Sequence, residues 1–260
     1  MSNNLVLIER LKDKLSGEGE SGKHALYQSL PISLKGFLGE VEYQPSSRYE
    51  HERFKVFQQF VDFTNKKVID IGCNLGFFSF SALTAGAATV HSFEGSSSHA
   101  QFIEDARQLL SLECQLEIEN KYFDFECNSG TYDIGLLLNV LHHVGDDYGS
   151  KELVISDALT QISSQLNGMS SLCQCLIFQL GFNWHGNNSF PLFEFGTKRE
   201  MIDFIQQVTK GNWIVEKVLV AERSSSQQVE YKEVNDSNVE RDDSLGEFLN
   251  RPIFILKSLK

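Results

Sequence analysis

The stretch Val68–Phe80, VIDIGCNLGFFSF, decides the fold of this chain. It begins as an apolar strand that contains one acid, Asp70, and Gly72 and Gly76 then mark a tight turn before a second apolar segment with helical character. A strand, a glycine-bearing turn and a helix in this order bring the backbone close to a ligand, toward which the first N–H groups of the helix point. The stretch therefore predicts the cofactor site of an α/β sheet.

The turn has the spacing D-x-G-x-x-x-G, which differs from the G-x-G-x-x-G of dinucleotide-binding folds. Its middle position is Asn74. Asparagine tolerates the left-handed backbone conformation that such a turn demands, so we expect the turn to form without a third glycine. The altered spacing disfavours an NAD or FAD site.

Strand and helix patterns alternate from Lys66 onward, which is typical of a parallel sheet with crossover helices. We predict an α/β fold with a Rossmann-like, seven-stranded, mostly parallel sheet and helices on both faces. The predicted strands are Lys67–Ile71, Thr89–Phe93, Gln115–Glu119, Ile134–Asn139, Leu172–Leu180, Trp213–Glu222 and Pro252–Lys257. The predicted helices between them are Phe77–Ala85, Ser98–Leu112, Lys151–Leu166 and Lys198–Val208.

Residues 1–65 precede the sheet and form a separate N-terminal helical extension in this prediction. Helical patterns cover Leu5–Leu15 and Tyr49–Phe63, and such an extension packs on the sheet or covers the cofactor mouth as a lid. Residues 66–260 form the sheet domain. Its polar stretch at 224–245 is expected to be an exposed loop or a partly ordered insertion.

Composition excludes several classes of protein. The formal net charge of −12 makes nucleic acid an unfavourable partner, because a grip on phosphates needs clustered Lys and Arg. No run approaches the roughly 18 to 20 apolar residues of a membrane span, and the first residues do not resemble a secretory leader, so a cytoplasmic protein is expected. The five cysteines include no C-x-x-C pair, which indicates neither a disulfide framework nor a zinc site, and the sequence names no metal ligands and leaves metal dependence open.

Polar residues follow the second and third predicted strands. Glu94 lies 24 residues after Asp70 (94 − 70) and can accept hydrogen bonds from two ribose hydroxyls. The alternative is an acid that only stabilises the start of the next helix. After the third strand, Asn120 or Asp124 could reach an adenine edge, although Asp124 is equally compatible with a solvated loop position.

Histidines follow the fourth predicted strand, in TYDIGLLLNVLHHV. The strand ends at Asn139, and His142 and His143 come directly after it, at the sheet edge where open α/β proteins place ligands. Histidine exchanges a proton near neutral pH, so either residue is a candidate base. His185, in QLGFNWHGNNSF, is another candidate, unless that segment is an ordinary surface loop.

The segment PSSRYEHERF, before the sheet, carries a further set of candidates. Arg48 and Tyr49 could contact a cofactor carboxylate or an anionic substrate, since an arginine can make a bidentate contact with such a group. The alternative is the charged start of a helix.

Taken together, these segments resemble the class I S-adenosylmethionine-dependent methyltransferases over roughly residues 66–181. The resemblance implies S-adenosylmethionine as cofactor and a role for each matching residue. The implied assignments are Gly72, Asn74 and Gly76 beneath the cofactor, Asp70 supporting the turn or the methionine ammonium, Glu94 at the ribose, Asp124 at the adenine, and Asn139 with Leu141 at the methionine end.

Shorter patterns resemble the methyltransferase parts of bacterial polysaccharide-modifying enzymes: the segment around Arg48, the L-H-H-V strand end and the closing strand Arg251–Ile255. This implies methyl transfer to an oxygen, a hydroxyl or a phosphate, of a small molecule or glycan in polysaccharide biosynthesis. A hydroxyl acceptor needs a base, whereas a phosphate does not. An RNA methyltransferase and a non-catalytic, methyltransferase-like binding scaffold are the alternatives, and the oligomeric state is left open.

Overall fold

The computed structural model describes residues 3–16, 28–39, 41, 43, 48–126 and 130–260. The chain divides into two compact units, Met1–Tyr122 (unit 1) and Phe123–Lys260 (unit 2). The α/β class is confirmed, and the described residues form eight strands, one more than predicted. No helix in these residues combines the length and the apolar composition that crossing a membrane requires.

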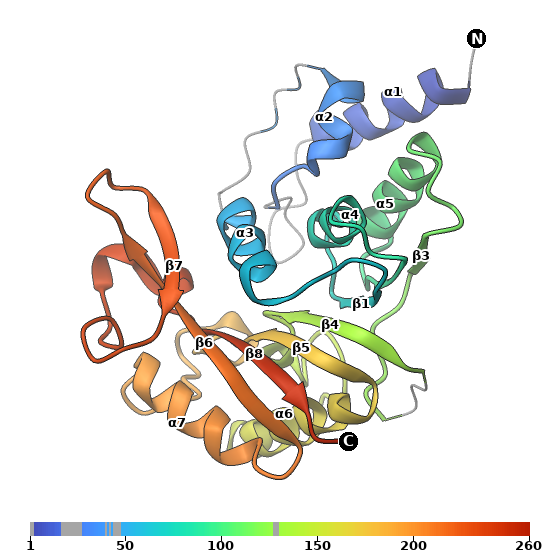
Figure 1. Ribbon diagram of the computed structural model, residues 1–260. Helices are drawn as coiled ribbons and strands as arrows, with labels where there is room; N and C mark the ends of the chain where they lie inside the picture. Colours follow the sequence, from blue (N-terminus) through green and yellow to red (C-terminus); the bar gives the residue numbers. More distant parts are fainter. Residues whose placement is uncertain (1–2, 17–27, 40, 42, 44–47, 127–129) are drawn as a thin grey trace. The chain divides into compact units, whose positions relative to one another are not determined.

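Unit 1 contains the sheet segment predicted around the glycine-bearing turn. Strands β1 (Lys67–Ile71), β2 (Thr89–Phe93) and β3 (Leu116–Glu119) are parallel, with β2 between the other two. Helices α4 (Phe77–Thr84) and α5 (Ser97–Leu109) connect the strands and lie together over one face of them (Figure 1). This succession of strand, helix and strand places the carboxyl ends of β1 and β2 side by side.

The core of unit 1 is rich in phenylalanine. Helix α4 buries its three phenylalanines, Phe77, Phe78 and Phe80, as a mostly apolar helix is expected to do. Phe78 of α4 contacts Phe54 and Phe57, with ring centroids 6.4 and 5.7 Å away. These two residues belong to α3 (Glu50–Phe60), so the segment before the sheet packs directly on the helix that follows the turn.

The N-terminal extension contains α1 (Asn3–Ser16), α2 (Ile32–Leu38) and α3. The first and third match the helical patterns in the sequence. Helix α2, a seven-residue helix that carries Gly36 in its interior, was not predicted from the sequence. The predicted boundary at residue 65 lies inside unit 1, and residues 17–27 of the extension lie outside the described residues.

Helix α1 is held against α5 by polar contacts as well as by its apolar face. Arg10 forms a 2.8 Å ion pair with the buried Asp105, and the Lys14 ammonium donates a 2.8 Å hydrogen bond to the Ser98 carbonyl oxygen. Ionic contacts to a buried carboxylate fix the orientation of a helix more firmly than exposed ion pairs do.

Unit 2 contains the other five strands in the order β4-β5-β8-β6-β7. Strands β4 and β5 are parallel and largely buried, whereas β8 pairs antiparallel with both β5 and β6. Helices α6 (Ile155–Gly168) and α7 (Lys198–Val208) lie on one side of these strands (Figure 1). The strand bounds are β4 Tyr132–Leu138, β5 Cys173–Gln179, β6 Trp213–Arg223 and β8 Ile253–Ser258.

The polar stretch at 224–245 is not a loop throughout. It contains β7 (Val229–Glu233), which pairs antiparallel with β6, and the short helix η4 (Asp243–Leu245), followed by α8 (Gly246–Leu249). Val229 and Tyr231 are buried while the residues next to them are exposed. Of the two alternatives, an exposed loop was wrong at β7, whereas a partly ordered insertion is compatible with it. Polar composition concealed the two-residue alternation that is the usual mark of a half-buried strand.

Candidate functional site

The turn after β1 has three left-handed residues. Gly72, Asn74 and Gly76 have φ angles of 70°, 54° and 77°. The expectation for Asn74 is confirmed, since asparagine occupies the position where dinucleotide folds have glycine. At Gly76 even a Cβ would lie 3.0 Å from the Phe80 ring, so the start of α4 leaves no room for a side chain there.

The turn is fixed to the end of β2 by backbone hydrogen bonds. The N–H groups of Gly72 and Cys73 both donate to the Phe93 carbonyl oxygen, at 2.9 and 3.2 Å. Asn74 continues the pattern, because its N–H donates to the Glu94 carboxylate at 2.8 Å. The carboxyl ends of β1 and β2 therefore form one rigid piece.

Glu94 itself helps to hold this turn in place. Its Oε2 accepts from the Asn74 N–H and its Oε1 from the Ser96 N–H, each at 2.8 Å, and the residue is only 9% exposed. A carboxylate oxygen can accept more than one hydrogen bond, so these contacts to the turn are compatible with the predicted role of Glu94 at ribose hydroxyls. Because Ser96 is also the N-cap of α5, Glu94 helps to fix the start of that helix, while its role at a ribose stays a prediction.

Two polar residues next to Glu94 extend the site. His99, buried in α5, lies 3.8 Å from the Glu94 carboxylate and 3.3 Å from the Asn74 side-chain amide. Asn120 donates a 3.0 Å hydrogen bond to the Glu94 carbonyl oxygen. The sequence did not point to His99, because a single histidine in an amphipathic helix carries no motif.

Asp70 is buried at the end of β1, next to the turn. The Ser79 hydroxyl donates a 2.6 Å hydrogen bond to it and lies 2.9 Å from the Ser92 hydroxyl. Burial raises the pKa of Asp70 to about 7; Glu94 adds to this rise, while the Ser79 hydrogen bond and the positive charge of Arg53 oppose it. The carboxyl is therefore poised to change charge near neutral pH.

Replacing Asp70 by asparagine is expected to stabilise the free protein above neutral pH. The folded-state pKa lies above the unfolded value of about 3.9, so between about pH 4 and 7 the folded protein holds a proton that the unfolded chain has lost, and stability falls as pH rises through that window. We expect Asp70→Asn to gain on the order of 2 kcal/mol more at pH 8 than at pH 5 in denaturant titrations. The exposed Asp203→Asn is the control, and an equal gain at both pH values would contradict the assignment.

The N-terminal extension reaches the turn through Gln28. Its buried side-chain oxygen accepts a 2.9 Å hydrogen bond from the Phe77 N–H at the start of α4. Arg48 and Tyr49 lie just before α3, half-buried, and Tyr49 is the N-cap with a φ of 55°. The buried cation is Arg53, one turn further on, with its guanidinium 4.9 Å from the Phe78 ring centroid. A role for Arg48 and Tyr49 in cofactor binding stays a prediction.

In unit 2, Asn139 directly follows β4 and belongs to a polar network. Its amide nitrogen donates to the Gln179 side chain at 2.9 Å, and its amide oxygen accepts from Arg251 at 2.8 Å. Arg251 also forms a bidentate pair with Glu247, at 3.0 and 2.6 Å. The Asn139 backbone N–H also donates to the Gln179 carbonyl oxygen, at 2.8 Å, so Asn139 is tied to β5 through both its backbone and its side chain, and its role at the cofactor stays a prediction.

His142 and His143 have very different surroundings. His142 is 2% exposed, and its Nδ1 accepts a 3.3 Å hydrogen bond from the Gly181 N–H. Burial, together with the charges of His143, Arg251 and His185, holds the pKa of His142 well below its usual range, so it stays neutral. His143 is partly exposed, and its Nδ1 lies 3.5 Å from the Asp147 carboxylate.

The loop that carries His185 lies next to the segment of His143. The Trp184 indole N–H donates to the Val144 carbonyl oxygen at 2.7 Å, and His185 Nε2 lies 3.2 Å from the same oxygen. The rings of Trp184 and His185 are 3.9 Å apart. The structure brings all three candidate bases into one region of unit 2, since the rings of His142 and His143 are 4.2 Å apart, and among the contacts described only His143 has a carboxylate beside it.

Asp124 lies in unit 2, in the loop that precedes β4. It is exposed, and its carboxylate accepts a 2.9 Å hydrogen bond from the Glu126 N–H, which closes a local turn. Its suggested role at the adenine stays a prediction.

No protein-family model and no curated protein sequence matches this chain. Solved structures do. WbdD, a bifunctional kinase-methyltransferase, shares 16% identity at a TM-score of 0.57, over 95% of this chain and 46% of its own. A proposed S-adenosylmethionine-dependent methyltransferase from Listeria monocytogenes shares 15% (TM-score 0.52, 80% of this chain and 97% of its own), and a proposed RNA methyltransferase from Pyrococcus horikoshii, PH1948, shares 12% (TM-score 0.50, 97% and 99%).

These likenesses confirm the resemblance at the level of the fold. The chain has the fold of S-adenosylmethionine-dependent methyltransferases. At identities of 12–16% the likeness carries the fold alone, so the chemistry has to be argued from the residues of this chain.

Proposed function

We propose that this protein is an S-adenosylmethionine-dependent methyltransferase that methylates an oxygen, a hydroxyl or a phosphate, of a small molecule or glycan. The observation that carries the proposal is the position of Glu94. Its carboxylate is fixed by the N–H groups of Asn74 and Ser96 beside a turn with three left-handed residues. A rigid carboxylate, whose oxygens can each accept more than one hydrogen bond, suits the two neighbouring hydroxyls of a ribose.

The charges around the turn suit the other end of this cofactor. Its methionine part carries an ammonium and a carboxylate, and unit 1 buries an acid, Asp70, and a cation, Arg53, close enough to influence one another. Asp70 would hold the ammonium and Arg53 the carboxylate. Asp124 at the adenine and Asn139 at the methionine end complete the set of predicted contacts.

The bound cofactor supplies a methyl group made electrophilic by its sulfonium, so the protein contributes position and proton transfer. Holding an acceptor in line can contribute on the order of 7–11 kcal/mol. His143 would act as the base that removes the proton of a hydroxyl acceptor. Its Nε2 would accept that proton, because its Nδ1 faces the Asp147 carboxylate at 3.5 Å. The carboxylate orients the ring and stabilises the imidazolium that forms. His142 is too deeply buried to share this role.

Calorimetric titration with S-adenosylmethionine and its demethylated product tests the cofactor assignment. We expect both to bind at one site per chain, and a folded sample that binds neither would reject the proposal. Mass spectrometry would then screen nucleotide sugars, glycan termini and phosphorylated sugars for the gain of one methyl group. Cofactor binding without transfer to any acceptor would instead favour the non-catalytic scaffold.

An RNA methyltransferase is the second candidate. It is favoured by the likeness to PH1948, which spans 97% of this chain and 99% of that protein. The net charge of −12 counts against it, since an RNA backbone needs positive charge. Transfer of a labelled methyl group to RNA but to no sugar or glycan would decide for this candidate.

A further inference from the structure

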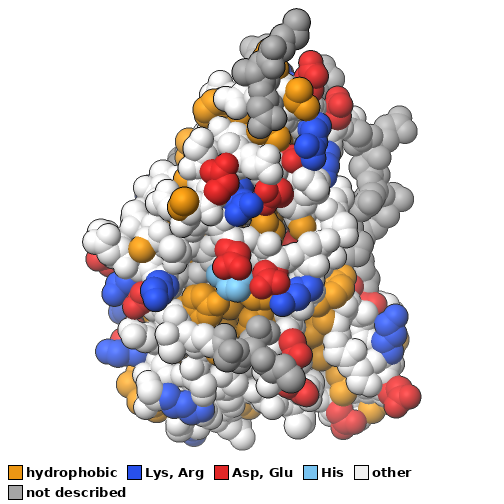
Figure 2. All heavy atoms as spheres, turned by 90° about the vertical axis from the view of Figure 1, so that its right-hand side faces the viewer, with side chains coloured by type: hydrophobic (Ala, Val, Ile, Leu, Met, Phe, Trp, Pro, Cys, Tyr) orange, Lys and Arg blue, Asp and Glu red, His pale blue; other side chains and the backbone are white. Residues whose placement is uncertain are grey.

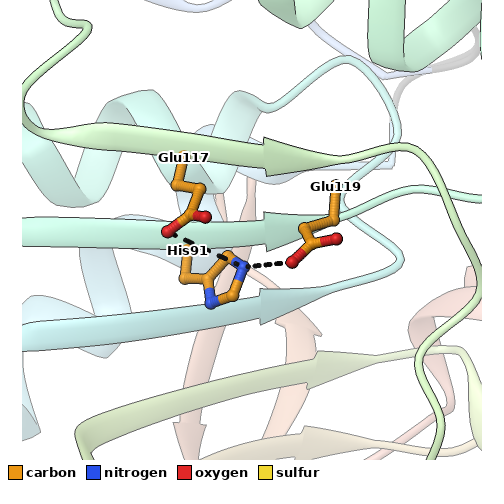
Figure 3. Close-up of side chains that lie close together, drawn as sticks. All are labelled: His91, Glu117 and Glu119. Atoms are coloured by element: carbon orange, nitrogen blue, oxygen red, sulfur yellow. Dashed lines mark ion pairs between the residues drawn. The ribbon is translucent and has the colours of Figure 1, made fainter.

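His91, Glu117 and Glu119 form a cluster of side chains outside the proposed cofactor site. His91 is on β2, and the two acids are on its neighbour β3, where Glu117 is paired with His91 and Glu119 with Phe93. Alternate residues of a strand point to the same side, so all three side chains leave the sheet on one face. In Figure 3 both carboxylates turn toward the imidazole, and Figure 2 shows a histidine grouped with acidic side chains at the surface.

The potential ligand atoms of the three side chains lie close to one another. His91 Nε2 lies 3.4 Å from Glu119 Oε1 and 4.0 Å from Glu117 Oε2. One potential ligand atom from each residue lies within 4.8 Å of the other two. The two strands hold the backbone positions, so only side-chain rotations remain to close the group.

A tetrahedral zinc ion with ligand bonds near 2.0–2.1 Å separates neighbouring ligand atoms by about 3.3 Å. The separation of His91 and Glu119 already has this value to within about 0.1 Å. Glu117 must move about 0.7 Å closer to His91, and its side chain is 69% exposed, so solvent rather than packing surrounds it. The ion would therefore enter without a change in the sheet.

We propose that His91, Glu117 and Glu119 bind a divalent transition-metal ion of the zinc class. Imidazole disfavours magnesium and calcium, which prefer oxygen ligands alone, whereas zinc accepts nitrogen and carboxylate oxygen together. Three protein ligands leave a fourth position for water or a second group. This inference rests on unit 1 alone and does not depend on methyl transfer.

The surroundings of the cluster support one defined position for the ion. The His91 ring packs on Phe93, with centroids 4.4 Å apart, which limits rotation of the imidazole. Lys121 pairs with Glu119 through Oε2 at 3.0 Å, on the oxygen that does not face His91. The lysine therefore neutralises part of the excess negative charge and leaves Oε1 directed at the ion.

The connection to β2 suggests how the ion would affect the rest of unit 1. The Glu119 carbonyl oxygen accepts a 3.0 Å hydrogen bond from the Glu94 N–H. An ion that bridges β2 and β3 would tie together the two strand ends on which Glu94 is held. Bound metal is therefore expected to raise the thermal stability of the protein.

Zinc titration of tag-free protein at pH 7.5 tests the proposal. We expect the wild type to bind zinc with a rise in melting temperature. His91→Gln and Glu119→Gln should each lower the affinity for one equivalent of zinc at least tenfold. Cobalt added in place of zinc should give visible absorption bands of a four-coordinate site, which the His91→Gln variant lacks. Circular dichroism of the metal-free variants establishes that they are folded.

Two controls separate this site from others on the chain. Glu230→Gln changes an exposed acid on β7 and should bind zinc as the wild type does. His143→Ala removes the histidine from a second group, with Asp146 and Asp147, whose ligand atoms also lie within 4.8 Å. The proposal is overturned if the wild type binds no zinc, if His91→Gln binds as many equivalents as the wild type, or if only His143→Ala loses one.

Discussion

Replacement of His143 by alanine is expected to lower kcat for a hydroxyl acceptor by about 10²–10⁴-fold, which is the usual contribution of a general base. The affinity for S-adenosylmethionine should stay within twofold of the wild type, because the proposed ribose contact belongs to Glu94. The expectation rests on the carboxylate of Asp147, 3.5 Å from His143 Nδ1, which leaves Nε2 to accept the proton. Steady-state rates and calorimetry on the same preparation measure the two quantities separately.

Two further variants make this result specific. His185→Ala is the matched control, since it removes a nearby imidazole that has no carboxylate beside it among the described contacts, and it should cost less than tenfold. Asp147→Asn should lower kcat about tenfold and shift the pH profile of kcat, as expected of a residue that positions the base. A large loss with His185→Ala and none with His143→Ala would reverse the assignment. Normal turnover in both would indicate a phosphate acceptor, which needs no base.

Replacement of Glu94 by glutamine is expected to weaken S-adenosylmethionine binding about 100-fold. Hydrogen bonds to a charged acceptor contribute roughly 1.5–3 kcal/mol each, and the glutamine amide nitrogen cannot accept one. That nitrogen would also face the N–H of Asn74 or Ser96, which donates to the carboxylate in the wild type. The free variant should therefore melt at a lower temperature, and calorimetry with an unfolding curve resolves both effects.

Glu230→Gln at an exposed position is the control, because it removes one negative charge without removing a proposed cofactor contact. It should alter neither cofactor affinity nor melting temperature. If Glu94→Gln lowered the melting temperature but bound the cofactor normally, Glu94 would serve the turn alone. The ribose assignment, and with it the observation that carries the proposed function, would then fail.

Much of the fold could be predicted because its strands are buried runs bounded by glycine or polar residues. Strands β1 and β2 and helix α7 have the predicted bounds. Several short elements were missed, and for β7 and α2 the physical reason is clear. In β7 only two buried residues alternate with charged ones, and α2 has too few residues to show a helical period.

Some features of the candidate site could likewise be predicted from the sequence, and others could not. The left-handed conformation of Asn74 follows from residue type and spacing, both of which the sequence displays. Neither the raised pKa of Asp70 nor the burial of His142 was predictable, because each depends on what surrounds the side chain in three dimensions. Adjacent histidines of the same motif thus come to have unrelated chemistry.

The close approach of Gly181 to His142 has an evolutionary consequence. A Cβ on Gly181 would lie 2.7 Å from two atoms of the imidazole, and the same glycine donates its N–H to that ring. Neither position can change alone without a steric clash or the loss of a buried partner. In divergent homologues the two positions should covary, with a bulkier residue at 181 accompanied by a smaller one at 142. That pair gives sequence searches a signature that does not depend on the glycine-bearing turn.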